Sequence, residues 1–400
     1  MTSDPMIYLD HMASTPCDQQ VVEAMMPYWR AEFGNPHSTS HAAGWAAAKA
    51  VDQAAQAIAG LINARPRDIL FTSGASEANN MALKGGCLWR AAQPDSGAAQ
   101  RNHLVTFASE HKCVLQSAKA LEQQGIAVTI LPIEPDGGID LAKLKSVLTP
   151  NTAMLSVMAA NNEIGTIYPL RELSNLAHKV GAWFHTDAAQ AFGKIKLDVE
   201  ADGIDLLSIS GHKIYGPKGI GALYMRGRAN QTGAMKVNLI PLIDGGGQQR
   251  GLRAGTIPTP LAVGLGMAAK CAAMLMESEQ AALTALRDHL LARLQAGLPN
   301  RITVNGSMDQ RLAGNLHVNI QGVEANDIFA SCPALAISAG SACSSAGTQA
   351  SHVLDAIGVD PSIIQASLRF GLGRDTRLEQ IDAAANMIIM AASTTNSASA

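Results

Sequence analysis

The sequence carries almost no excess of charge of either sign. Its 400 residues contain 30 lysines and arginines against 33 aspartates and glutamates, a formal net charge of −3 at pH 7. Nucleic-acid-binding proteins of this size usually show a basic excess or a basic stripe, and neither is visible here. The same balance argues against a role at a membrane surface. We therefore expect neither nucleic acid nor a membrane among the partners.

Cysteine is scarce, and we find no apolar run of 18 residues. Six cysteines without a Cys-x-x-Cys pair predict neither a disulfide framework nor a zinc site. The missing apolar run predicts no transmembrane helix, and the first ten residues lack the basic and apolar regions of a signal peptide. We expect a cytoplasmic protein in which most cysteines are structural, namely Cys17, Cys87, Cys113, Cys271 and Cys332.

Apolar residues are plentiful, and their pattern indicates an α/β fold. They make up 47% of the chain, enough for a sizeable core and, at this length, for two domains. Between residues 40 and 260, short β-branched runs alternate with alanine-rich helical ones. Strands are predicted at 68–72, 103–108, 127–131, 153–158, 183–186, 206–210 and 221–225, and helices at 42–61, from 76 and at 113–124. This alternation predicts a mainly parallel sheet covered by helices.

The pattern changes after Pro258. A long helical region at 261–298 precedes strands at 302–304 and 315–320, and a last helix is predicted at 378–392. The boundary falls in the glycine- and proline-rich stretch 244–260. We predict a large α/β domain over residues 16–257 and a smaller α+β domain formed by residues 1–15 and 258–400.

Polar side chains follow two of the predicted strands, at the edge where such sheets bind ligands. The segment 71–77 enters a helix whose first N–H groups, with the hydroxyls of Ser73 and Ser76, could bind an anion. An ordinary helix cap explains this segment equally well. Asp187 ends an apolar strand, where a carboxylate needs a cationic partner such as a protonated ring nitrogen. Taken alone, it too is explained by a helix cap.

Lys213 follows a third strand, in the glycine-rich loop 211–221. A lysine in a strand-end pocket can form a Schiff base, although a loop lysine is more often a solvated cation. Ser210 and His212 beside it suit contact with a phosphate. No Gly-Lys-Ser/Thr follows residue 77, and the Gly219-Ile-Gly221 segment leads into a strand, so neither a Walker A motif nor a dinucleotide fingerprint is present.

Cys343 differs from the other cysteines. It lies in the run Ile337–Gly347, in which ten of the eleven residues are glycine, alanine, serine or cysteine. A flexible polar loop carrying a thiol suits a nucleophile that must move; an incidental exposed cysteine is the alternative.

Taken together, these segments resemble the pyridoxal-phosphate (PLP) enzymes of fold type I. The chain is similar to the class V aminotransferase family, and within it to the group I cysteine desulfurases of the NifS/IscS kind, from Ile7 to Arg374. The motifs that carry the resemblance are Phe33-Gly-Asn-Pro36, Ser109-Glu-His-Lys112, Asn161-Asn-Glu-Ile-Gly165, Ser210-Gly-His-Lys213 and Gly340-Ser-Ala-Cys343. Gln248 and Gln249 depart from it, because a glutamate is frequent there.

The resemblance implies roles for the matching residues. Lys213 would hold PLP and move the α-proton, Asp187 would pair with the pyridinium nitrogen, and His111 would stack on the ring. Gln190 would hydrogen-bond the ring oxygen. The phosphate would be held by Ala75, Ser76, Ser210 and His212, and by Thr256 of a neighbouring subunit, which implies a homodimer. Asn162 and Arg369 would clamp the substrate carboxylate, Arg369 as a bidentate fork.

The implied reaction converts L-cysteine to L-alanine. The Cys343 thiolate would take the sulfur as a persulfide and pass it to an acceptor protein, for iron–sulfur cluster assembly or tRNA thiolation. A selenocysteine lyase or another class V PLP lyase is the enzymatic alternative, and its activity would survive the loss of Cys343. A catalytically idle scaffold would be expected to lack Lys213 or Cys343, and both are present. A nicotinamide dehydrogenase would need the missing glycine fingerprint.

Overall fold

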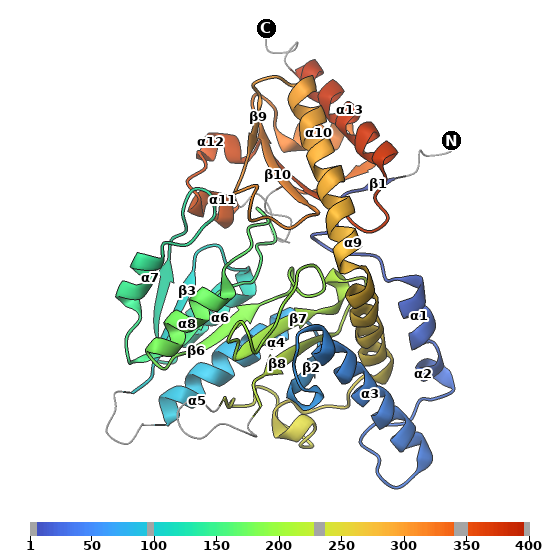
Figure 1. The fold of residues 1–400 in the computed structure, drawn as a ribbon, viewed down its shortest axis with the longest axis vertical. Coiled ribbons are helices and arrows are strands. Elements are labelled where there is room, and N and C mark those ends of the chain that lie inside the picture. Colours follow the sequence, from blue (N-terminus) through green and yellow to red (C-terminus); the bar gives the residue numbers. More distant parts are fainter. Residues whose placement is uncertain (1–5, 94–99, 228–236, 340–350, 396–400) are drawn as a thin grey trace.

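A seven-stranded sheet forms the centre of the larger part of the molecule (Figure 1). The structure is a computed structural model and describes residues 6–93, 100–227, 237–339 and 351–395. The strand order is β2 (Ile69–Thr72), β8 (Gly221–Met225), β7 (Leu206–Ser210), β6 (Trp183–Asp187), β5 (Thr152–Ser156), β3 (His103–Phe107) and β4 (Ala127–Leu131). The strands from β7 to β4 are parallel, whereas β8 is antiparallel to both of its neighbours. The predicted mainly parallel α/β sheet is confirmed.

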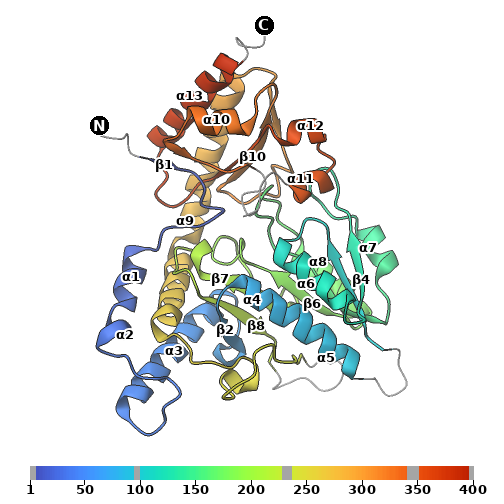
Figure 2. The ribbon, with the colours of Figure 1, turned by 180° about the vertical axis from the view of Figure 1, so that it is seen from behind.

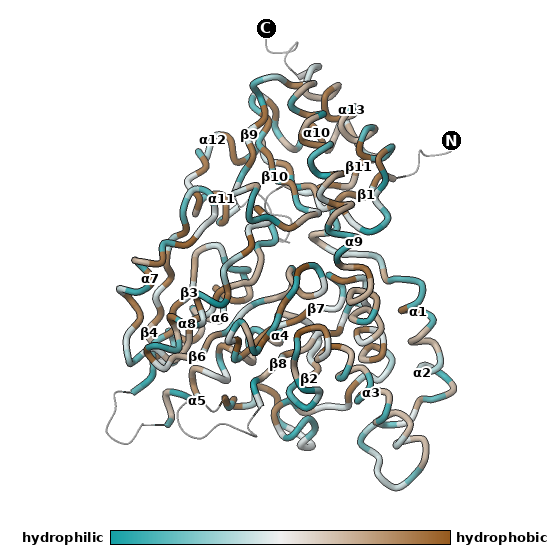
Figure 3. Tube along the Cα trace, viewed as in Figure 1, coloured by the Kyte–Doolittle hydropathy of each residue, from teal (hydrophilic) through white to brown (hydrophobic). Residues whose placement is uncertain are grey.

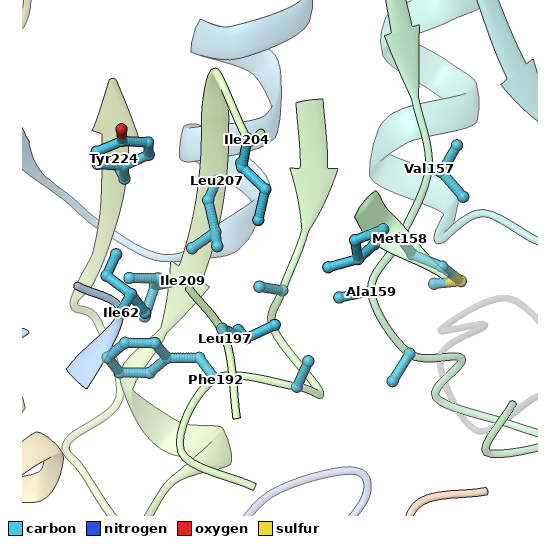
Figure 4. Packing of buried hydrophobic residues seen from close by; sticks show 14 of the residues in the cluster. Ile62, Val157, Met158, Ala159, Phe192, Leu197, Ile204, Leu207, Ile209 and Tyr224 are labelled. Atoms are coloured by element: carbon cyan, nitrogen blue, oxygen red, sulfur yellow. The ribbon is translucent and has the colours of Figure 1, made fainter. Parts of the chain in front are cut away.

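Helices cover both faces of this sheet, because successive strand side chains point to opposite sides. On one face Leu70, Leu104 and Leu206 pack with the helices α4 (Ala75–Asn80), α5 (Gly86–Ala92) and α6 (Lys112–Glu122), which lie in front of the sheet in Figure 2. On the other face Leu207 and Tyr224 belong to a second cluster, part of which is drawn in Figure 4. That cluster includes side chains of α3 (Ala42–Leu61), α7 (Leu141–Val147) and α8 (Leu170–Lys179).

A smaller antiparallel sheet lies beyond the carboxyl ends of the large one. Its order is β12 (Ser367–Gly371), β10 (Asn315–Ile320) and β9 (Ile302–Val304). It has its own buried cluster with α10 (Ala325–Ser331) and α13 (Leu378–Thr395). The N-terminal strand β1 (Ile7–Tyr8) pairs with β11 (Leu335–Ala336), so the first described residues join this part. We propose these two cores as the two domains predicted from the sequence.

The helix α9 (Thr259–Gly297) connects the two cores. Its N-terminal part packs on α3 and on α1 (Gln19–Met25), and Gly266 permits the close approach, since a Cβ there would lie 2.6 Å from the Ala54 Cα. The short helices α2 (Pro27–Arg30), α11 (His352–Ala356) and α12 (Pro361–Ile364) complete the described elements named here.

The same helix corrects the sequence analysis on one point. Within the described residues, α9 contains an 18-residue window apolar enough to cross a membrane, although none was expected. In that window 56% of the residues are buried inside the protein, and Figure 3 shows this segment as largely hydrophobic beside α3. A buried helix at the centre of a fold is apolar for the same reason as a membrane span, so its hydropathy is explained by packing.

Candidate active site

A cavity of about 540 Å³ opens at the carboxyl ends of β6 and β7. Ten of the predicted site residues line it: Ala75, Ser76, His111, Asn162, Asp187, Gln190, Ser210, His212, Lys213 and Arg369. They come from segments far apart in the sequence and meet because the parallel strands end at one edge. The predicted clustering of these residues is therefore present in the fold.

The Lys213 ammonium points into this cavity from the turn Gly211–Lys213 that follows β7. Its Nζ donates hydrogen bonds to the backbone oxygens of Met12 (2.8 Å) and Ala13 (2.7 Å). The Gln190 Nε2 donates to the same Met12 oxygen, also at 2.8 Å. Two donors from different strand ends thus lie beside one acceptor. In the same arrangement, Gln190 could reach the ring oxygen of PLP and Lys213 its aldehyde carbon.

The N-terminal segment holds the Lys213 turn in place. The Thr15 hydroxyl donates to the His212 backbone oxygen (3.0 Å) and accepts from the Tyr215 backbone N–H (2.8 Å). Tyr215 has a φ of +64°, a conformation that a tyrosine rarely adopts without such support. The sequence analysis did not predict this contact between the N-terminal segment and the Lys213 turn.

Asp187 is buried at the end of β6 and is held by two donors. The Asn79 side-chain amide donates to its Oδ2 (2.7 Å), and the Ala189 backbone N–H donates to its Oδ1 (2.9 Å). These bonds fix the orientation of the carboxyl group, which is the group that would pair with a protonated ring nitrogen. Asn79, which lies on α4, was not predicted.

His111 caps the N-terminus of α6, where its Nδ1 accepts from the Cys113 backbone N–H at 3.2 Å. Burial lowers the pKa of His111; Asp187 opposes this and the Lys213 charge adds to it. The structure therefore favours a neutral imidazole, which can lie flat on an aromatic ring and accept a proton.

Cys113 was expected to be structural, but it lines the cavity. Its sulfur lies 3.2 Å from the Asn79 Nδ2 and 3.0 Å from the His111 Nδ1. Burial, and then the charge of Asp187, raise the pKa of this thiol to about 12. Cys113 is thus a protonated thiol at neutral pH, placed where no nucleophilic sulfur was predicted.

The start of α4 fits a phosphate. Gly74 precedes the helix without capping it by a side chain, and a Cβ at Gly74 would meet nothing within 4 Å. The residues of this helix start line the cavity beside the hydroxyls of Ser76 and Ser210, so its backbone N–H groups could take part in holding a phosphate. The Glu77 carboxylate accepts the Ser73 backbone N–H at 2.7 Å and pairs with Arg253 at 2.8 Å.

His212 completes the phosphate cradle as a neutral group. Burial and the charges of Lys213 and Lys218 lower its pKa to about 4. Its Nδ1 lies 3.1 Å from the Ser14 hydroxyl, which fixes the ring plane. With the Lys213 and Gln190 donors and the Asp187 carboxylate, the cavity offers a matching group to each polar part of PLP.

Arg369 lies on β12 and reaches the cavity from the small sheet. It is 1% exposed; its Nη2 pairs with the Asp10 carboxylate at 2.9 Å, and its Nη1 donates to the Asn162 backbone oxygen at 3.2 Å. The Nε finds no partner among the described residues. Asp10 therefore orients the guanidinium and already occupies one arm of the fork that the sequence analysis assigned to a substrate carboxylate.

One predicted site residue lies outside the cavity of this chain, and another falls outside the described residues. Thr256 is exposed and lies outside it. Cys343 lies in residues 340–350, outside the described residues. The described neighbours on either side of that segment contact the site: Ser338 pairs through its backbone with Arg369, and Ser351 donates to Glu163.

Glu163 should make the stability of the folded chain depend on pH. Burial raises its pKa to about 7, against the opposing effects of Ser351 and Arg369. The folded chain thus holds this proton more tightly than the unfolded chain, and the resulting stability, about 3 kcal/mol, is lost as the pH rises from about 4.5 through 7.

Glutamine does not titrate, so we expect Glu163→Gln to gain stability relative to the parent chain between pH 5 and pH 8. Urea unfolding at both pH values measures this gain. A difference between the two proteins that is the same at both pH values would contradict the assignment. The Ser351→Ala variant, which keeps the carboxyl, is the matched control and should retain the pH dependence.

Nearly the whole chain is similar to known proteins. The family profile described as aminotransferase class-V matches residues 7–384. The cysteine desulfurase IscS of Rickettsia bellii is 48% identical over 382 residues, covering 96% of this chain and 90% of that protein. A solved NifS-like protein superposes with a TM-score of 0.86 at 30% identity, covering 97% of this chain and all of the other. The solved structure of SspA in complex with cysteine superposes with a TM-score of 0.77 at 37% identity. The match covers 91% of this chain and 98% of that chain.

Proposed function

The chain belongs to the aminotransferase class-V family, and on that premise we propose that it is a cysteine desulfurase. The enzyme depends on pyridoxal 5'-phosphate and converts L-cysteine to L-alanine, transferring the sulfur to a cysteine of the enzyme. The observation that carries the proposal is the convergence of the Lys213 and Gln190 donors on one acceptor, in a cavity that also contains the buried Asp187.

In this proposal, Lys213 would hold the aldehyde end of the cofactor and Asp187 would pair with its ring nitrogen. Lys213 would hold the cofactor through its aldehyde carbon and would move the proton of the substrate α-carbon. Asp187, fixed by Asn79, keeps the ring nitrogen protonated. The bound cofactor supplies an electron sink that stabilises negative charge on the substrate.

The remaining cavity residues bind and orient. The start of α4, with Ser76, Ser210 and His212, takes the phosphate, and His111 stacks on the ring. Arg369 and Asn162 bind the substrate carboxylate, and the Asp10 pair sets the direction of the guanidinium. Cys343 is the nucleophile that removes the sulfur.

We propose that the enzyme acts as a homodimer. Thr256 is exposed in this chain and lies outside its cavity, as expected for a residue that completes the phosphate site of a neighbouring subunit. Large apolar side chains between residues 22 and 45 are also exposed, including Phe33 (77% exposed) and Trp45 (59% exposed). We propose that these side chains contribute to the interface between the two subunits.

The sulfur acceptor is a further protein or carrier in this proposal. The persulfide on Cys343 is passed on for iron–sulfur cluster assembly or tRNA thiolation, in the cytoplasm.

The test is product release by the PLP-loaded wild-type chain. With L-cysteine and a thiol reductant, we expect sulfide and alanine in equal amounts. With L-cysteine limited to about one equivalent per active site and no reductant, alanine should form together with one added sulfur atom on the enzyme, seen by mass spectrometry. Alanine without a sulfur atom on the enzyme would favour a lyase, and no product in either condition would overturn the proposal.

A further inference from the structure

Lys194 lies beside two of the proposed cofactor-binding residues, Gln190 and Lys213. It follows Gly193, which has a φ of +73° and turns the chain after β6. The Gln280 side chain on α9 donates to the Lys194 backbone oxygen and fixes this turn from the other side. Lys194 and Lys213 line the same small pocket, so the Lys194 side chain points toward the site and not into solvent.

The Lys194 ammonium donates a hydrogen bond to the Gln190 Oε1 at 2.9 Å. An ammonium has only donors and a backbone carbonyl has only acceptors. Lys194 can therefore contact only the oxygen of the Gln190 amide, and the Met12 carbonyl can contact only its nitrogen. The two partners together leave one orientation for the amide, with its NH2 group on the side of Lys213.

This orientation matters for the ring oxygen of PLP. An NH2 group facing that oxygen stabilises its negative charge, whereas a carbonyl oxygen there would repel it. The Met12 carbonyl holds the amide only while no cofactor oxygen takes its place as acceptor. Lys194 bonds the opposite end of the amide, so its contact can remain when the cofactor is bound.

We propose that Lys194 is a positioning residue, whose ammonium holds the Gln190 amide with its NH2 group toward the ring oxygen of the cofactor. The inference deepens the proposed function and rests on it. Lys194 acts through Gln190 and does not itself touch the reacting atoms.

The electrostatic surroundings make the Gln190 contact important for the Lys194 ammonium. Burial, followed by repulsion from Lys213 and Arg369, lowers the pKa of Lys194 to about 7, while Glu279 opposes the shift. An ammonium kept in such a position costs free energy unless it has a specific acceptor. The Gln190 oxygen is that acceptor.

The experiment is a pH titration of the absorbance of the lysine-bound cofactor, which reads its pKa without turnover. A donor to the ring oxygen lowers this pKa, because it stabilises the negative charge that remains when the proton leaves. We expect Lys194→Met to raise it by about one pH unit, the size of a lost charge-stabilising hydrogen bond. Lys194→Gln, which keeps a donor but no charge, should stay near the wild type.

The double variant separates positioning from the plain effect of a charge. Gln190→Ala should raise the pKa by a similar amount, and adding Lys194→Met to it should raise it no further. A Lys194→Met variant that titrates like the wild type, or a double variant in which the two shifts add, would overturn the inference. Lys194→Leu is the second apolar variant if the methionine protein is unstable, and circular dichroism checks the fold of each.

These outcomes differ from a failure of the proposed function. A wild-type chain that binds no cofactor removes both proposals at once. A wild-type chain that binds and titrates the cofactor but releases nothing from L-cysteine removes only the proposed function, and the variants still decide the role of Lys194.

Discussion

A Lys213→Ala variant is expected to lose L-cysteine turnover by a factor of at least about 10³, because the residue serves both as the attachment point and as the proton carrier. Its ammonium lies within hydrogen-bond distance of the Met12 and Ala13 carbonyls at the mouth of the cavity. An alanine leaves no amine there, and water cannot replace a positioned base at the same effective concentration.

The measurement has two readouts. Steady-state alanine release gives the rate, and borohydride reduction followed by peptide mapping gives the site of attachment. We expect the cofactor on the peptide that contains Lys213 in the wild type and no such adduct in the variant. Lys196→Ala is the matched control, since Lys196 is exposed, and it should behave like the wild type. Turnover by the Lys213→Ala variant above about a tenth of the wild-type rate would contradict the assignment.

The sheet and much of the site could be predicted because both depend on local patterns. Five strands, β4, β7, β8, β9 and β10, begin and end where they were predicted from short β-branched and apolar runs. Asp187 and Lys213 each follow a strand, and parallel strands bring such residues to one edge. A sequence pattern within ten residues therefore suffices to place them in a shared cavity.

The contacts that hold Lys213 could not be predicted in this way. Met12 and Ala13 act through backbone carbonyls, which every residue has, so their side chains carry no signal of the contact. They lie 201 and 200 residues from Lys213, and contacts distant in the sequence bring them there, including the pairing of β1 with β11 and the bridge between Asp10 and Gly371.

Arg369 shows a similar limit. Its strand β12 was not predicted, because all five of its residues are buried, the polar Ser367 and Arg369 included, so the pattern of apolar residues does not mark it as a strand. Only the resemblance to a known family indicated the residue. Its ion pair with Asp10 joins residues 359 apart in the chain, which no local pattern could reveal.

The second large effect is expected for Cys343→Ser. Sulfur leaves the substrate only when a thiolate attacks it, and a serine hydroxyl is not ionised at neutral pH. We expect sulfide release to fall by a factor of at least about 10², with cofactor binding unchanged. Turnover that survives in this variant would instead favour a selenocysteine lyase or another class V lyase.

The pKa values of the other thiols support Cys343 as the nucleophile. Burial raises the pKa of Cys87 and Cys113 to about 12 and also raises those of Cys17, Cys271 and Cys332. Each therefore remains a protonated thiol at pH 7, including Cys113, which lies inside the cavity.

The matched comparison is therefore Cys113→Ser, which removes a thiol from the cavity itself. If Cys343 is the nucleophile, this variant should still add a sulfur atom to the enzyme in a single turnover with L-cysteine, detected by mass spectrometry, and Cys343→Ser should not. The reverse result would move the nucleophile to Cys113. It would then require that the bound substrate lowers the Cys113 pKa by several units, against both its burial and the charge of Asp187.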